Sequence, residues 1–136
     1  MEFSEALPLL QENHTAVAST ISRSGKAQAT VVSTSVLNGK VAFASREGTV
    51  KERNIQRTGR AAVTVIKLDT RRYVTVEGPA TVQQWQDDPA HLQLLRDVYN
   101  AMGRPPGDDF DANMRKDRRS VIMVSPERVY GSLTVR

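Results

Sequence analysis

The sequence predicts a mainly β protein, with accessory helices, in which six antiparallel strands curl into a barrel whose open ends the helices cover. Six segments carry the β-branched or alternating pattern of strands, and the pair Asn38-Gly39 marks a tight hairpin between two of them. The chain has no strand–helix–strand rhythm of the kind that builds a parallel sheet. Its 136 residues fit one domain, 1–136, with a core that needs no cross-links.

The N-terminal half is expected to form one helix followed by a three-stranded meander. The helix covers 4–12 and begins at Ser4, a residue suited to the N-cap position. Asn38-Gly39 joins two strands in a two-residue turn, because both positions accept a positive φ. The strands expected here are 15–22, 27–37 and 40–45.

The C-terminal half is expected to add two helices and three strands. A helix over 49–57 opens with the capping box Thr49-x-x-Glu52. The strand 73–82 alternates cleanly, so that Gly78 faces the core and Thr75 faces out. The other elements expected are strands at 61–66 and 120–130, a helix at 89–102 and a short amphipathic turn at 110–114.

The composition narrows the chemistry and the location. The chain has no cysteine, which excludes disulfides, thiolate metal sites and cysteine nucleophiles, and its two histidines, His14 and His91, lie far apart. We therefore expect no metal centre. No secretory leader or membrane-length apolar segment is visible, so the expected location is the cytoplasm. The net charge of +4 suits anionic small molecules without indicating a nucleic-acid binder.

The stretch from Ser45 to Asn54 is the most informative part of the sequence. A predicted strand ends at Ser45, and a helix starts a few residues later. Helix N-termini present free N–H groups and a partial positive charge, which suit an anionic phosphate. Arg46 and Lys51 add two cations near that point, and Asn54 shares a helix face with Lys51. This pattern predicts a phosphate site at the start of the helix.

The same residues also fit a helix with no ligand. Thr49 and Glu52 would then only satisfy the first-turn donors, and the basic residues would form a solvated face. Arg53 points away from Lys51, toward a second anionic group or solvent. Gln28 and Thr30, on the second strand, fit hydrogen bonding to a heterocycle or plain exposed strand positions.

No catalytic group can be named from the sequence. It contains no Ser/His/Asp set, paired-carboxylate motif, Walker loop or GxGxxG. Tyr73, on an outward strand face, fits either a wall beside a bound ring or an ordinary cross-strand contact. Any catalysis is therefore expected to use a bound cofactor, which the chain positions.

Several blocks, taken in order, resemble one family over nearly the whole length. They are TAVASTISRSGKAQATVVS, FASREGTVKERNIQRTGRAAVTV with its K-x-R-N-[IL] motif, YVTVEGPATV, and DRRSVIMVSPERVYG. The chain is similar to the pyridoxamine-phosphate-oxidase-like split β-barrel flavoproteins, which share the FMN-binding fold. Within them it most resembles the small deazaflavin-dependent reductases that use coenzyme F420.

This resemblance implies a function and a site. The implied function is hydride transfer from reduced F420 to a small, flat, electron-poor organic substrate, with FMN as the alternative cofactor. The proton would come from solvent or from Tyr73. The resemblance also implies a homodimer with two cofactor sites at its interface, each bordered by Tyr73 of the neighbouring subunit. The cofactor-binding positions expected from the pattern and the resemblance together are Gln28, Thr30, Ser45, Arg46, Lys51, Arg53, Asn54 and Tyr73.

Two other functions remain open, and the residues also bear on the oligomeric state. The expected cofactor cleft at the dimer interface also fits a non-catalytic carrier or sensor of a flavin or haem. A nucleic-acid-binding barrel is disfavoured, because aromatic residues make up only 5% of the chain and stacking platforms are scarce. A homodimer is expected because several small or apolar residues are assigned to an outward sheet face that a monomer would expose. These residues are Ala16, Ala18, Val32 and Val36.

Overall fold

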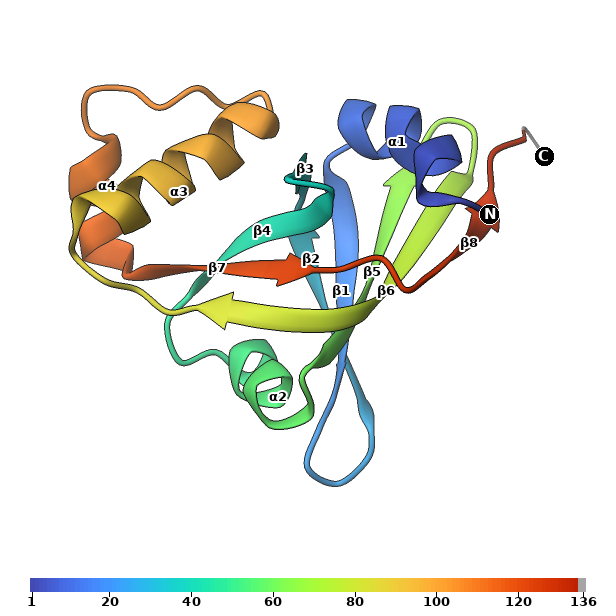
Figure 1. Ribbon diagram of the computed structural model, residues 1–136, viewed down its shortest axis with the longest axis horizontal. Coiled ribbons are helices and arrows are strands. Elements are labelled where there is room, and N and C mark those ends of the chain that lie inside the picture. The colour runs from blue at the N-terminus through green and yellow to red at the C-terminus, as the bar shows by residue number, and fades with distance from the viewer. Residues whose placement is uncertain (135–136) are drawn as a thin grey trace.

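The sheet is antiparallel throughout and its two ends do not join, as the ribbon of the computed structural model shows (Figure 1). The structure describes residues 1–134, and within them it has eight strands and four helices. The strands are β1 (Thr15–Ile21), β2 (Ala27–Ser33), β3 (Ser35–Leu37), β4 (Lys40–Arg46), β5 (Arg60–Lys67), β6 (Arg72–Gln83), β7 (Arg119–Val124) and β8 (Arg128–Ser132). The helices are α1 (Phe3–Glu12), α2 (Val50–Thr58), α3 (Pro89–Ala101) and α4 (Phe110–Asp117).

The strand order places a gap between β2 and β4. Along the sheet the order is β2-β1-β5-β6-β7-β4-β3, with β8 also paired to β6. The long strand β6 joins the two halves, because Tyr73–Glu77 pair with β8 and Ala80–Gln83 pair with β7. In the described residues β2 pairs only with β1, so its other edge faces β4 across the split.

The prediction of a mainly β split barrel is confirmed, and the prediction of six strands is wrong. The expected strand 27–37 breaks at Thr34, whose N–H donates to the carbonyl of His14 (2.8 Å). The expected strand 120–130 breaks where residues 125–127 cross β6, with the Ser125 N–H bonded to the carbonyl of Pro79 (2.8 Å). Each of these two predicted strands is therefore two strands in the structure.

Two apolar clusters fill the fold. One lies inside the barrel and includes Phe43 and Ile122, and the other lies between the sheet and helices α3 and α4. Ala16 and Ala18 are completely buried in the barrel cluster, and Val32 and Val36 pack against it, so the predicted outward orientation of these four residues is wrong. Thr75 is also buried rather than exposed, next to the hydroxyl of Thr64 (2.7 Å).

The predicted hairpin turn is confirmed, and the predicted start of the first helix is wrong. Asn38 and Gly39 both have positive φ, of 53° and 73°, which confirms the two-residue hairpin. Helix α1 begins one residue earlier than expected, and its N-cap is Glu2, in a capping box with Glu5, rather than Ser4. Within residues 1–134, no helix has both the length and the apolar character needed to cross a membrane.

Candidate functional site

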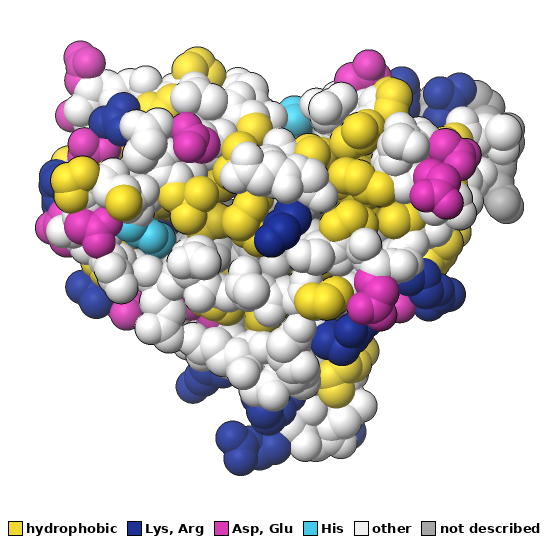
Figure 2. All heavy atoms as spheres, viewed as in Figure 1, with side chains coloured by type: hydrophobic (Ala, Val, Ile, Leu, Met, Phe, Trp, Pro, Cys, Tyr) yellow, Lys and Arg dark blue, Asp and Glu magenta, His cyan; other side chains and the backbone are white. Residues whose placement is uncertain are grey.

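A cleft of about 400 Å³ opens at the split between β2 and β4. The start of α2, the end of α3 and the first residue of β7 complete its walls. Lys and Arg side chains also gather at the lower end of Figure 2, where Figure 1 places α2 and the β1–β2 turn. The lining residues are Val31, Val32, Ser33, Ala44, Ser45, Arg46, Thr49, Lys51, Tyr99, Met102, Arg104 and Arg119.

Four of the lining residues are cations, and no carboxylate lines the cleft within residues 1–134. Arg46 and Arg119 lie on paired strands in direct register, and Asp117 stands 3.7 Å from one and 3.6 Å from the other. In the same described range Lys51 and Arg104 have no ion-pair partner. The cleft is therefore a site of net positive charge.

Lys51 lies in the first turn of α2 and is half-buried at the cleft wall. Burial lowers the pKa of its ammonium group below the ordinary value, the charge of Glu52 opposes this, and Arg119 adds to it. A cation held in partial burial near a second cation is stabilised by an incoming anion, because the anion supplies the missing opposite charge.

The start of α2 is not capped in the predicted way. Thr49 is the N-cap residue, but its side chain accepts no bond from the helix backbone, and its hydroxyl lies 3.0 Å from that of Ser45. Glu52 does not reach back to Thr49 either, because its carboxylate accepts from the hydroxyl of Ser120 (3.1 Å). The predicted capping box is therefore wrong, and the first-turn N–H groups stay available to an anion beside Lys51.

Three of the eight predicted site residues, Ser45, Arg46 and Lys51, come together in the cleft. Three others, Gln28, Thr30 and Asn54, lie instead in a chain of hydrogen bonds beneath α2. Asn54 donates to Thr20 (3.1 Å), Thr20 donates to Gln28 (3.1 Å), and Gln28 donates to Thr30 (2.8 Å). Arg57 also donates to Asn54 (3.1 Å) and to the carbonyl of Ile21. This chain ties α2 to β1 and β2.

Asn54→Ala is expected to lower the free energy of unfolding by about 1–3 kcal/mol, because it leaves the buried hydroxyl of Thr20 without the amide that donates to it. Asn54 is only 4% exposed, so water cannot replace those bonds. Urea denaturation measures the change. The control is Gln56→Ala, at an exposed position two residues along the same helix, and it should change stability little. Equal effects of the two substitutions would contradict the structural role of Asn54.

The remaining two predicted residues lie outside the cleft lining of this chain. Arg53 is exposed on α2. Tyr73 lies on β6 in register with Ile66 and Ser132. The role expected of Tyr73 is at the cleft of a neighbouring subunit.

Sequence reasoning did not select Tyr99, Arg104 or Arg119 as site residues. Gly103 has a positive φ of 73°, and the Arg104 N–H then bonds back to the carbonyl of Tyr99 (2.9 Å), which holds both residues at the cleft rim. The Tyr99 ring packs edge-to-face on Phe110. A glycine directly after a predicted helix was the available signal for this return of the chain. Arg119 is placed only by its sheet register with Arg46.

Solved structures of low sequence identity share this fold. The conserved hypothetical protein Rv2991 of Mycobacterium tuberculosis is 20% identical, with a TM-score of 0.75, over 96% of this chain and 84% of that chain. An F420 reductase is 22% identical, with a TM-score of 0.67, over 90% and 94%. A heme binding protein from Mycobacterium smegmatis is 15% identical, with a TM-score of 0.68, over 97% and 54%.

Comparison with known sequences gives the family directly. No curated protein matches the chain. The sequence model described as pyridoxamine 5'-phosphate oxidase matches residues 4–132, which is nearly the whole chain. The order of strands, the split between β2 and β4 and the cationic cleft at that split all lie within the matched range. The chain therefore belongs to the pyridoxamine 5'-phosphate oxidase family and has its split-barrel fold.

Proposed function

We propose that this protein is a reductase that binds coenzyme F420 in the cleft and reduces a small electron-poor organic molecule. The observation that carries the proposal is the cationic cleft at the uncapped start of α2, lined by Arg46, Lys51 and Arg119. The likeness to an F420 reductase agrees with it. A deazaflavin with a polyanionic glutamate tail suits four lining cations better than FMN does, because its additional negative charges compensate more of the positive charge of the cleft.

The residues present fit a phosphate-bearing flat ring. The Nε atom of Arg119 is buried and has no hydrogen-bond partner among the described residues, so an acceptor is missing there. Val31, Val32 and Met102 give the cleft an apolar side on which a ring can lie. When bound in reduced form, the deazaflavin supplies a hydride, and a proton from solvent completes the two-electron reduction of the acceptor.

The test is a titration of the purified protein with F420 and with FMN, followed by fluorescence. We expect tighter binding of F420. The protein should then oxidise reduced F420 in the presence of quinone or enone acceptors, without added metal. Tighter FMN binding would transfer the proposal to FMN. Tight binding with no turnover over a broad acceptor panel, or a haem absorbance band, would favour a carrier.

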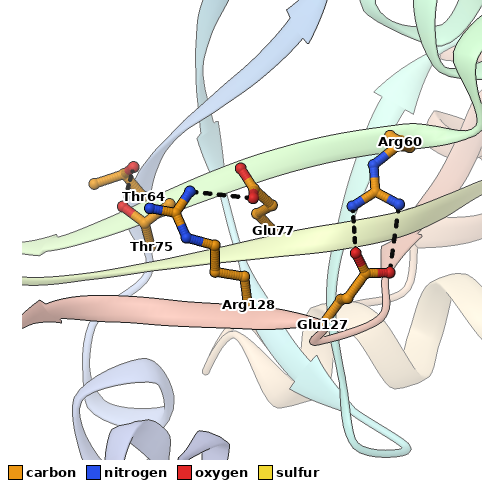
Figure 3. Close-up of polar contacts among 6 residues, drawn as sticks. All are labelled: Arg60, Thr64, Thr75, Glu77, Glu127 and Arg128. Carbon is orange, nitrogen blue, oxygen red and sulfur yellow. Dashed lines mark hydrogen bonds and ion pairs between the residues drawn. The ribbon is translucent and has the colours of Figure 1, made fainter. Parts of the chain in front are cut away.

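We also propose that the protein is a homodimer, joined through the outer face of β1, β2, β5, β6 and β8. Val31 and Ile21 are 74% and 48% exposed on this face. Figure 3 shows its polar side, where Arg60 pairs with Glu127 (2.8 Å) and Arg128 with Glu77 (3.3 Å). Strand alternation places Tyr73 on the same face as Glu77. Because Val31 also lines the cleft, a partner on this face would border the site and bring its own Tyr73 near it.

Ala62→Glu is expected to convert the dimer into a monomer, because it buries a charge against an apolar partner surface. Ala62 lies in a hollow of this face with Ser19 and Ile21, and Arg60 and Glu77 stand at the same hollow. Light scattering at micromolar concentration measures the mass, and circular dichroism shows whether the variant is folded. Ala112→Glu, at an exposed position of α4, should leave the dimer intact. A monomeric parent protein would refute the shared-site arrangement.

A further inference from the structure

Glu52 is a buried acid directly behind the cationic cleft. The residue is 2% exposed, although it lies in the first turn of a surface helix. Its Oε1 atom accepts a hydrogen bond from Ser120 Oγ at 3.1 Å. Its Oε2 atom is also buried and has no hydrogen-bond partner among the described residues. A carboxylate with one unsatisfied oxygen is a costly group to bury, so its presence calls for an explanation.

A short set of contacts connects Glu52 to the cleft. Ser120 on β7 lies opposite Ser45 on β4, and both serines are buried. Ser45 lines the cleft, and its hydroxyl lies 3.0 Å from the hydroxyl of Thr49 at the start of α2. Lys51, the residue before Glu52, also lines the cleft. The Glu52 carboxylate is therefore one layer of side chains from any anion that Lys51 binds.

Lys51 is the charged group that acts most directly on Glu52, and it forms no ion pair with the Glu52 carboxylate. Lys51 is the cation that acts on it from its own helix, and Arg119 of β7 acts in turn on Lys51. The strands packed on this side, β4 and β7, present the hydroxyls of Ser45 and Ser120. From β1, Thr20 meets the same helix through Asn54. Burial raises the pKa of the Glu52 carboxyl above its ordinary value. The hydroxyls of Ser45 and Ser120, the backbone of Gly48 and the charge of Lys51 oppose this in that order, without cancelling it.

We propose that Glu52 is a positioning residue whose protonation is linked to anion binding, so that an anionic group enters the cleft together with one proton bound by Glu52. The inference rests on the anion site of the proposed function. An ionised Glu52 repels an anion held by Lys51 and also weakens the attraction that Lys51 exerts. A neutral Glu52 removes the repulsion and leaves the charge of Lys51 uncompensated until the anion arrives.

The test uses sulfate, which stays a dianion at pH 5.5–7.5 and so brings no proton of its own. Sulfate is titrated into the full chain and followed by NMR at several pH values in this range. In the parent protein the affinity should fall about fivefold or more as the pH rises. In Glu52→Gln, which is neutral at every pH, it should change less than about twofold. By reciprocity, sulfate should also move the carboxyl titration of Glu52 to higher pH.

Two further variants keep the inference open to refutation if Glu52→Gln folds poorly. Ser120→Ala removes the donor to the ionised carboxylate, so the pH range over which sulfate affinity falls should move upward. Glu47→Gln is the control, because Glu47 is an acid paired on the surface with Arg118 and does not line the cleft. It should keep the pH dependence of the parent. Equal pH dependence in the parent and Glu52→Gln, or no sulfate binding, would overturn the inference.

Failure of this inference and failure of the proposed function give different results. If sulfate binds with the expected pH dependence but neither F420 nor FMN binds, the reductase proposal fails and the role of Glu52 stands. If F420 binds and is turned over but sulfate affinity is independent of pH, the reductase proposal stands and the role of Glu52 fails.

Discussion

Replacing Gly78 with alanine is expected to lower the free energy of unfolding by about 3 kcal/mol or more. A Cβ atom at this position would lie 2.1 Å from the carbonyl oxygen of Ser125 and 3.0 Å from the backbone nitrogen of Glu127. Both neighbours are backbone atoms of the link that crosses β6 between β7 and β8. That link is held by bonds to the backbone of Pro79 and Glu77 on either side of the glycine. Backbone fixed on both sides cannot move aside cheaply.

Urea denaturation of the purified variant measures this loss, and Gly107→Ala is the matched control. A Cβ atom at Gly107 would meet nothing within 4 Å, and this glycine is not among those with positive φ. The control should therefore change stability by less than about 0.5 kcal/mol. If Gly78→Ala is as stable as the control, the link between β7 and β8 is not fixed against Gly78 and can move aside for a methyl group.

The strand pattern could be predicted well where local chemistry decides it. Asn38-Gly39 fixes the hairpin because its turn needs two positive φ angles, whatever surrounds it. Alternation in β1 likewise separated two faces, but it did not show which one is inside. Ala16 and Ala18 were assigned to the outward face, whereas the core takes these two alanines, in one cluster with larger residues of other strands such as Phe43.

The errors come from contacts made between distant parts of the chain. Thr34 fits a strand by propensity, but the chain changes its partner strand there: residues up to Ser33 pair with β1, and residues from Ser35 pair with β4. Glu52 has the spacing of a capping box, and it turns inward because Ser120, 68 residues away, offers a hydroxyl. Strand propensity and capping-box spacing consider only residues close in sequence, so they cannot anticipate a partner that the fold brings from another part of the chain.

The site was predictable only in the part that one segment supplies. Ser45, Arg46 and Lys51 belong to a single strand–loop–helix unit that lines the cleft. The helix-start argument named Arg46 and Lys51, and the family resemblance named Ser45. Asn54 was assigned to the ligand because it shares a helix side with Lys51, but the same geometry let it bond to Thr20 on β1. The rest of the lining comes from β2, the end of α3 and the start of β7, which only the fold brings near this unit.

Lys51→Ala is expected to weaken binding of F420 about ten- to a hundredfold. A charge-assisted contact to a phosphate is worth about 1.5–3 kcal/mol, and each 1.4 kcal/mol corresponds to about a tenfold change in affinity. Lys51 has no ion-pair partner in the described residues, so its charge is free for the ligand. Removing Lys51 should leave the stability of the ligand-free protein nearly unchanged, because the cost of its partial burial offsets its attraction to Glu52.

Fluorescence titration at two salt concentrations separates a direct contact from a general loss of positive charge. Lys26→Ala removes the same charge from the exposed turn between β1 and β2, outside the cleft lining. A screened charge at that distance should change affinity less than about twofold. In Lys51→Ala the salt dependence of binding should also decrease, because one ion pair with the ligand is gone. Equal binding by both variants would mean that the cations of the cleft act only through their summed field, and that no phosphate is held at the start of α2.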